Sequence, residues 1–216
     1  IRKVSSTGKP VIISTGASTL FELDEMVTTA REAGCKDLIL LKCTSNYPAS
    51  PENSNILTIP YLKKRYKLDI IRYQDETFLS IKEDKLIELA KEYKKKVNLP
   101  FIIESTINTV TEKKLIALKE MGCLSISFGL ESGNENLRKT VIKKPNFTNE
   151  QAIKNLKLVK KYGISFNIFN MVGFPEETVD MVYDTIEVNH IVKPPYCQVG
   201  FFQPWEGVAL RDYSID

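Results

Sequence analysis

The sequence predicts a parallel α/β fold, a TIM-like (β/α) barrel that is incomplete or open and has about seven strands. Short apolar, β-branched runs alternate with longer amphipathic stretches, and parallel strands need crossovers of that length. Polar residues also collect after the apolar runs rather than before them. With 216 residues, 43% of them hydrophobic, the chain is large enough for one core, so a single domain over residues 1–216 is expected.

Seven runs have the length and composition of β-strands. Each is uniformly hydrophobic, which is typical of strands that are covered on both faces. They are Val11–Ser14, Leu38–Cys43, Asp69–Tyr73, Phe101–Ser105, Ser125–Phe128, Ser165–Met171 and Gln198–Phe202.

Helix start signals fall between these runs. In a capping box, a Ser or Thr side chain and an acidic or amide side chain three residues later satisfy free N–H groups of the first turn. Three pairs fit this pattern: Thr19 with Glu22, Ser80 with Glu83, and Thr148 with Gln151.

Glycine marks the predicted helix ends, because it adopts the left-handed cap conformation at little cost. Gly34, Gly122 and Gly163 occupy such positions. Pro60 falls early in a helix expected to begin near Asn55, where a missing N–H is tolerated.

The charge of the chain is nearly balanced. The chain has 30 basic and 27 acidic residues, which gives no reason to expect nucleic acid or an anionic membrane as a partner.

The longest apolar runs of the sequence are of strand length and too short to span a bilayer. Residues Ile1–Val4 resemble the tail of a helix and no initiator Met precedes them, so we expect a piece of a longer chain.

The metal-ligating residues are few and scattered. Cys35, Cys43, Cys123 and Cys197 form no CxxC or CxxxCxxC group, which favours reduced cysteines and a cytoplasmic location. The single histidine, His190, lies in the apolar pattern of a predicted helix and is interpreted as structural. No metal site is predicted from these residues.

Polar residues follow every predicted strand, and in parallel α/β folds ligands bind at that edge. We therefore expect a small-molecule ligand at this rim, and an open barrel edge that permits oligomerisation. The rim segments are Ser14–Gly16, Thr44–Tyr47, Asp75–Glu76, Glu104–Ser105, Glu131–Gly133, Gly173–Glu176 and Gln203–Pro204.

The first rim segment has two interpretations. Gly16 allows a sharp turn that leaves hydroxyl and N–H groups of Ser14 and Thr15 free to meet an anion. Alternatively, these residues only help to cap the helix that begins after Thr19.

Two upstream segments, KPVIISTGASTLFELDE and LILLKCTSNYPASPENSN, resemble the N-acetylneuraminate (sialic acid) synthase family over about residues 7–66. That family condenses phosphoenolpyruvate with an amino sugar in a complete barrel. The resemblance implies a phosphoenolpyruvate or phosphate site at Lys9, Ser14, Thr15, Ser45 and Tyr47.

This resemblance has two departures. Lys42 stands where the family commonly has His, and the histidine-bearing strands that hold its divalent metal are absent. The Lewis acid for the substrate carbonyl would therefore be missing.

Four downstream segments, DETF, SISFGLESGNE, MVGFPEETVD and FFQPWEGVAL, resemble the radical SAM core over about residues 68–210, in the class often joined to a cobalamin-binding domain. The resemblance implies S-adenosylmethionine and a [4Fe-4S] cluster. It assigns Asp75 and Glu76 to the amino group, and Glu131, Ser132 and Gly133 to the carboxylate and ribose. It assigns Gly173, Phe174 and Pro175 to the adenine ring, and Gln203 and Pro204 to closing the site. Glu176 is also expected to bind the cofactor, without an assigned part of it.

An alternative for Asp75, Glu76 and Glu176 is that they favour helix N-termini. The family's cluster also needs three thiolates in a CxxxCxxC loop, and this sequence has none.

We therefore expect a chimera, built of residues 1–67 and 68–216, that lacks radical chemistry and retains S-adenosylmethionine binding. A phosphoenolpyruvate-dependent synthase-like fragment of carbohydrate biosynthesis and a non-catalytic scaffold remain alternatives. Whether the chain is an enzyme stays open.

Overall fold

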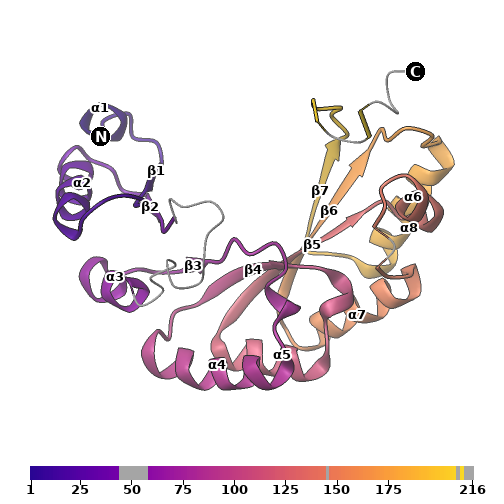
Figure 1. Cartoon of the computed structure of the whole chain (residues 1–216), viewed down its shortest axis with the longest axis horizontal. Coiled ribbons are helices and arrows are strands. Elements are labelled where there is room, and N and C mark those ends of the chain that lie inside the picture. The colour runs from indigo at the N-terminus through magenta and orange to yellow at the C-terminus, as the bar shows by residue number, and fades with distance from the viewer. Residues whose placement is uncertain (44–57, 145, 208–209, 212–216) are drawn as a thin grey trace. The chain divides into compact units, whose positions relative to one another are not determined.

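The computed structural model describes residues 1–43, 58–144, 146–207 and 210–211 (Figure 1). The chain divides into two compact units, Ile1–Ile59 and Pro60–Asp216. Every described strand pairing in both units is parallel, which confirms the predicted parallel α/β class.

Unit 1 is a small βαβ element. Val11 and Ile13 point to the same side of the sheet, where they pack with Ala30 and Cys35. The alternate residues of the strands lie on the other face and are exposed. Its elements are α1 (Arg2–Ser5), β1 (Val11–Ser14), α2 (Leu20–Glu32) and β2 (Leu38–Leu41), and α3 (Thr58–Tyr66) crosses into unit 2.

Unit 2 contains a five-stranded sheet in the order β3-β4-β5-β6-β7. Each strand is joined to the next by one or more helices, as parallel pairing requires. The elements are β3 (Ile71–Arg72), η2 (Phe78–Ser80), α4 (Glu83–Lys96), β4 (Phe101–Ser105), η3 (Ile107–Thr109), α5 (Glu112–Met121), β5 (Cys123–Glu131), α6 (Glu135–Thr140), α7 (Asn149–Lys161), β6 (Ser165–Val172), α8 (Val179–Val192) and β7 (Tyr196–Phe201).

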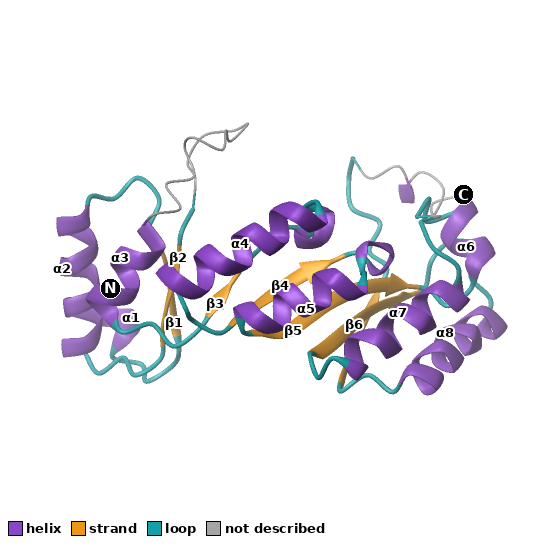
Figure 2. Ribbon diagram, turned by 90° about the horizontal axis from the view of Figure 1, so that it is seen from below, coloured by secondary structure: helices purple, strands orange, loops and turns teal. Residues whose placement is uncertain are grey.

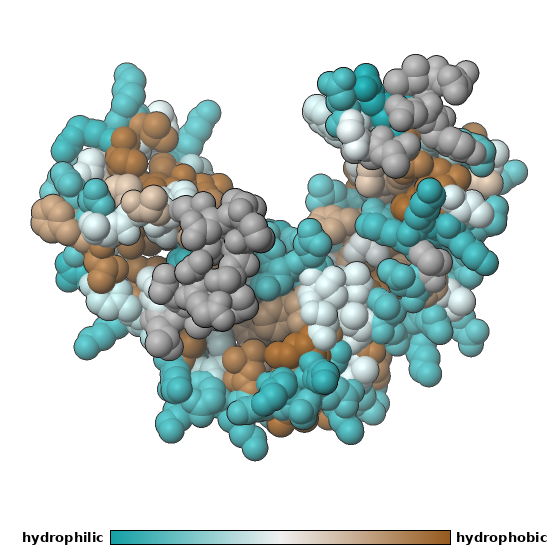
Figure 3. All heavy atoms as spheres, in the orientation of Figure 1, coloured by the Kyte–Doolittle hydropathy of each residue, from teal (hydrophilic) through white to brown (hydrophobic). Residues whose placement is uncertain are grey.

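The core of unit 2 lies between the sheet and its helices. Figure 2 shows α4, α5 and α7 along one side of the strands. Phe101, Phe128 and Phe166 alternate along β4, β5 and β6 with less buried residues and join the main hydrophobic cluster. Hydrophilic side chains cover the outer sides of α4 and α5 (Figure 3), where Lys94 and Lys95 are exposed.

The prediction of uniformly hydrophobic strands is wrong for this sheet. The residues that alternate with the core on β5 and β6 include Ser125, Ser127, Ser165 and Asn167. This second face, which we call the inner face, is therefore polar, because only the face toward the helices joins the apolar core.

The predicted strand positions are confirmed, with ends that shift by at most three residues. The capping boxes at Thr19–Glu22 and Thr148–Gln151 are present. The box at Ser80–Glu83 is wrong, because Ser80 ends a short 3-10 helix and α4 begins only at Glu83.

Helix ends follow the glycines as expected. Gly34, Gly122 and Gly163 all have positive φ angles, and Pro60 lies in the first turn of α3. The predicted start of that helix near Asn55 lies outside the described residues. The seven described strands form a two-stranded and a five-stranded sheet, which agrees with the predicted open or incomplete barrel, whereas a single domain over residues 1–216 stays a prediction.

Candidate functional site

Glu131 is the last residue of β5 and has an unusual backbone. Its φ angle is 65°, a conformation that non-glycine residues rarely adopt. Its carboxylate lies over Gly129, since a Cβ atom at Gly129 would be 2.6 Å from Glu131 Oε1. Lys144 Nζ lies 2.8 Å from the same oxygen, and the Glu131 side chain is 15% exposed. The result is a fixed, partly buried carboxylate at the carboxyl end of the sheet.

Ser132 and Gly133 are fully buried against α8 rather than directed to the rim. The Gly133 N–H donates to Thr185 Oγ1 (2.7 Å), and the two hydroxyls of Ser132 and Thr185 lie 3.4 Å apart. A Cβ atom at Gly133 would lie 2.3 Å from the Asp184 carbonyl oxygen. These two residues therefore fasten the loop after β5 to α8, with their backbone too close to admit a larger side chain.

The turn after β6 is held by a residue outside the predicted site. Glu177 accepts hydrogen bonds from the Gly173 N–H (2.5 Å) and the Phe174 N–H (3.3 Å). Phe174 is buried and its ring lies 5.3 Å from that of Phe202. The available sequence signal for this contact was the spacing in GFPEET, where Glu177 follows Gly173 by four residues. Glu176 has a φ angle of 63°, the second left-handed acidic residue at this edge.

Asp75 and Glu76 follow β3 and are exposed, as are Gln203 and Pro204 after β7. The helix N-terminus alternative is compatible with the acidic residues at this rim, because each of them precedes a helix. The first acidic residues of α4 are Glu83 and Asp84, and that of α8 is Asp180. Asp75, Glu76 and Glu176 thus lie in the connections that precede these helices.

The strand ends bring these segments to one edge of unit 2. Figure 1 shows β5, β6 and β7 ending side by side, and the strands pair in adjacent order. The structure therefore places the segments after β5, β6 and β7 near one another. Pro175 is half-buried in the β6 turn.

The inner face adds polar residues that were not predicted as site residues. Arg72 Nη2 donates to Glu104 Oε1 at 2.6 Å across β3 and β4. Ser127 pairs in register with Glu104 on one side and Asn167 on the other. The Asn167 side-chain oxygen is buried without a hydrogen-bond partner among the described residues. Polar residues at every second strand position were the available signal.

In unit 1 the hydroxyls of the first rim segment are already used. Thr15 Oγ1 donates to the Leu41 carbonyl oxygen (3.0 Å), and Ser14 Oγ accepts from the Gly16 N–H (3.3 Å). Lys9 is exposed. Ser45 and Tyr47 lie outside the described residues.

The N-terminus of α2 also already holds an anionic group. Glu22 Oε2 accepts from both the N–H and the hydroxyl of Thr19, each at 2.8 Å. These bonds, from the backbone first, hold the pKa of Glu22 below its ordinary value. Thr19 and Glu22 therefore cap α2, and the described hydrogen bonds of the Ser14 and Thr15 hydroxyls go to Gly16 and Leu41 instead, so an anion site at these two residues stays a prediction.

The structure describes the state of all four cysteines. All four are free, Cys35 and Cys123 buried and Cys43 and Cys197 exposed. Burial raises the pKa of the Cys123 thiol to about 12, whereas cluster ligands are thiolates. The part of the chain that the structure describes holds no group of three His, Cys, Asp or Glu side chains able to bind a metal.

Two further expectations concern helices. His190 is exposed on α8, so its interpretation as part of an apolar packing pattern is wrong. Among the described residues, no helix is both long enough and apolar enough to cross a membrane.

Comparison with known proteins finds two resemblances. A family model described as the NeuB family matches residues 1–97. A pseudaminic acid synthase of Campylobacter jejuni is 36% identical over 70 residues, which cover 32% of this chain and 20% of that protein. The match runs beyond the predicted junction near Lys67, through β3 and α4.

The second resemblance covers more of the chain. An uncharacterized methyltransferase of Pyrococcus horikoshii is 29% identical over 155 residues, 71% of this chain and 33% of that protein. The radical S-adenosylmethionine methyltransferase TsrM of Kitasatospora setae, solved with cobalamin and a [4Fe-4S] cluster, superposes with a TM-score of 0.60 at 18% identity. It covers 68% of this chain and 30% of that one. The chain spans a third or less of the length of these relatives, and the dual resemblance is confirmed.

Proposed function

We propose that unit 2 binds S-adenosylmethionine at the carboxyl ends of β3, β5, β6 and β7 and does not itself supply radical chemistry. The observation that carries this proposal is the backbone of Glu131. A non-glycine residue in the left-handed region costs about 1–3 kcal/mol and persists mainly at functional sites. Here the strained residue holds a carboxylate on the inner face at the end of β5, and Glu176 in the turn after β6 has a left-handed backbone as well.

The chain's residues fit the parts of this ligand. Asp75 and Glu76 are exposed carboxylates after β3 that suit a cationic amino group. Glu131 accepts hydrogen bonds and suits the ribose hydroxyls. The half-buried Phe202 beside Phe174 offers apolar surface to the adenine ring, and Gln203 with Pro204 lies at the end of that surface. S-adenosylmethionine supplies a sulfonium-activated methyl or adenosyl group when bound.

The roles of Ser132 and Gly133 in this proposal are indirect. Both are buried against α8, so they position Glu131 through the backbone. Gly173, Pro175 and Glu176 likewise shape the turn that presents Phe174.

No step through an iron–sulfur cluster is assigned to these residues. Cys123 lies at the amino end of β5 and Cys197 contacts Asn170 and Asn189 on the helix side of the sheet. Anaerobic iron–sulfur reconstitution should therefore give no cluster absorbance and no 5′-deoxyadenosine. A cluster that cleaves S-adenosylmethionine would contradict this part of the proposal.

The binding itself is tested by calorimetric titration with S-adenosylmethionine. Glu131→Gln should weaken binding about tenfold, because a charge-assisted hydrogen bond contributes roughly 1.5–3 kcal/mol. Glu120→Gln, the same change on the exposed side of α5, should leave the affinity unchanged. If S-adenosylmethionine does not bind at millimolar concentration, the scaffold alternative replaces the proposal.

A second candidate rests on the NeuB family match over residues 1–97. Under it the chain is part of a phosphoenolpyruvate-dependent synthase of carbohydrate biosynthesis, with Lys9 and Ser14 near the phosphate. Thermal-shift titration with phosphoenolpyruvate and a divalent metal tests this. Stabilisation that Lys9→Gln removes would favour it, whereas no stabilisation would exclude it for this chain.

The location and partners belong to the same proposal. Four free cysteines suit a reducing compartment, so we place the protein in the cytoplasm. The ligand is a small molecule.

The exposed edge of the five-stranded sheet favours self-association. Strand β7 forms this edge, and its residue Phe201 is 75% exposed. Sedimentation should show oligomers that Phe201→Lys reduces.

A further inference from the structure

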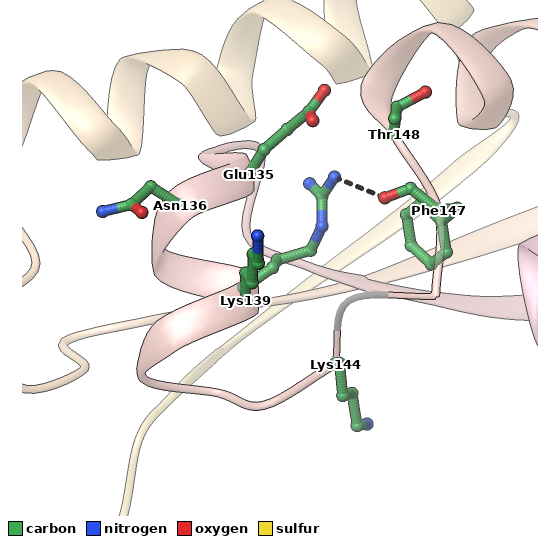
Figure 4. Close-up of a pocket in the computed structure, with 7 residues that line it drawn as sticks. Glu135, Asn136, Lys139, Lys144, Phe147 and Thr148 are labelled. Carbon is green, nitrogen blue, oxygen red and sulfur yellow. Dashed lines mark hydrogen bonds between the residues drawn. The ribbon is translucent and has the colours of Figure 1, made fainter.

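A cavity lies beside the short helix α6, and its lining includes none of the rim segments after β3 and β7. Its volume is about 430 Å³, and its lining includes Arg138, Lys139, Lys144, Glu135 and Thr148 (Figure 4). Three basic side chains and one acidic side chain make the lining cationic. A cavity of this size admits a small solute.

Arg138 is the most unusual residue of this cavity. It is only 1% exposed, yet an arginine side chain stays charged in proteins. Nη1 donates to the Ser132 carbonyl oxygen (2.5 Å), and Nη2 donates to the Phe147 carbonyl oxygen (3.3 Å, dashed in Figure 4). Nε is buried and has no partner among the described residues.

The structure shows no ion pair between this buried cation and an acidic side chain among the described residues. Within the part of the chain that the structure describes, no carboxylate oxygen lies within 4 Å of the guanidinium. Burial lowers the pKa of Arg138, and Glu135 opposes this effect. A buried charge without a counter-ion is costly, so the cavity is suited to an anion.

Glu135, the acidic residue of the lining, is already engaged. Its Oε1 atom accepts from the Asn149 N–H at 2.6 Å, in the first turn of α7. Thr148, which also lines the cavity, caps the same 13-residue helix. The positive end of the α7 dipole is therefore already paired with the Glu135 carboxylate, and the cationic lining rests on the basic side chains.

We propose that this cavity binds a small oxyanion of the phosphate type, with Arg138 and Lys139 as its donors. The anion is either inorganic phosphate or the phosphoryl group of a small ester, since both present the same oxygens. Lys144 contributes less, because it pairs with Glu131 and points away from Thr148 in Figure 4. This site does not depend on S-adenosylmethionine binding.

The alternative explanation is that Arg138 has only a structural role, which we call a strut: its guanidinium links two backbone segments. Its guanidinium joins the Ser132 and Phe147 carbonyl oxygens and lies 4.8 Å from the centre of the Phe147 ring. A strut would hold the loop after α6 without any ligand. The two explanations differ in whether the Nε–H group changes partner when phosphate is added.

The first experiment follows the Arg138 Nε–H resonance by NMR in the unmodified protein, with Arg138→Lys used only to assign it. Inorganic phosphate is titrated at constant ionic strength against chloride. A saturating shift of this resonance is expected in the millimolar range or below. An unmoved resonance at saturating phosphate would overturn the proposal in favour of the strut.

The second experiment compares two matched variants. Lys139→Gln in the cavity should weaken phosphate binding about fivefold, whereas Lys157→Gln, the same change on an exposed position of α7, should weaken it less than twofold. Equal weakening by both would show non-specific attraction and overturn the site. Glycerol 3-phosphate binding tighter than phosphate would identify an ester as the ligand, and weaker binding would identify the free ion.

Discussion

Both units of this chain pack parallel strands against helices, but unit 2 has a much larger buried hydrophobic cluster than unit 1. Unit 2 places five parallel strands against helices, and its cluster includes fully buried Phe101, Ile126 and Phe128. Among its described residues, unit 1 pairs only β1 with β2, and the cluster there has four buried residues. Two strands are marginal without further packing, so unit 1 should be the less stable unit.

The second face of the β1–β2 sheet also indicates that unit 1 is the less stable unit, because apolar residues on it are exposed. Ile12 and Ile39 pair in register and are 61% and 48% exposed. The equivalent inner face of β5 and β6 carries Ser127 and Asn167 instead. Exposed apolar strands lose the stabilisation of burial, whereas exposed polar strands lose little. Four pairs of matched substitutions test how far the two units differ.

The largest difference is expected from truncating one core isoleucine in each unit. Ile126→Ala in β5 should lower the free energy of unfolding by about 4 kcal/mol, because a cavity in a closely packed core cannot collapse. Ile13→Ala in β1 should cost about 2 kcal/mol, since Ile13 is 8% exposed and has few neighbours. Urea unfolding, with hydrogen exchange at β1 and β5 amides, measures both. Equal losses would contradict the comparison.

The second pair adds one methyl group to a glycine of each unit. Gly133→Ala places a Cβ atom 2.3 Å from the Asp184 carbonyl oxygen and should cost about 3 kcal/mol through overpacking. Gly34→Ala meets nothing within 4 Å, but its φ angle is 91°, so it should cost about 1 kcal/mol. Thermal unfolding measures both. A harmless Gly133→Ala would show that the loop after β5 can leave α8.

The third pair removes the two capping boxes. Thr148→Ala and Thr19→Ala each delete a bond from the third helical N–H and should each cost about 1 kcal/mol. Because the caps are local, the costs should be equal although the units differ in their cores. Amide exchange in the first turns of α7 and α2 reports each cap separately. A much larger cost in α2 would mean that unit 1 unfolds as a whole when its cap is lost.

The smallest difference is expected in the response to acid. The Thr19 backbone N–H holds the pKa of Glu22 below 4.5, and the Tyr162 hydroxyl does the same for Glu112. A carboxylate whose pKa is lowered on folding stabilises the fold at pH values above its unfolded pKa of 4.5. This stabilisation is lost as the pH falls through the lower pKa of the folded state. Glu22→Gln and Glu112→Gln should each flatten the pH dependence of stability below pH 4.5. An unchanged acid limb, measured by urea titration, would exclude either bond.

Much of the candidate site was predicted at the level of segments and less at the level of side chains. The segments after β5, β6 and β7 do reach one edge, because parallel strands share an orientation. The same reasoning could not tell that Ser132 turns toward α8. Nor could it predict that Arg138 is buried, since charged residues are usually placed on the surface.

The sequence alone determined two of three capping boxes and the glycine helix ends, because their hydrogen bonds close within a few residues. It also determined where the strands lie, from their apolar β-branched runs, and which two families the segments resemble. Only the tertiary structure decided which side of the sheet is polar and what Gly133 and Arg138 contact. Thr185 reaches Gly133 across 52 positions, and such contacts depend on how α8 packs. Hydrogen bonds between neighbouring residues can be predicted from the local sequence, whereas contacts between residues far apart in the sequence depend on how the elements pack.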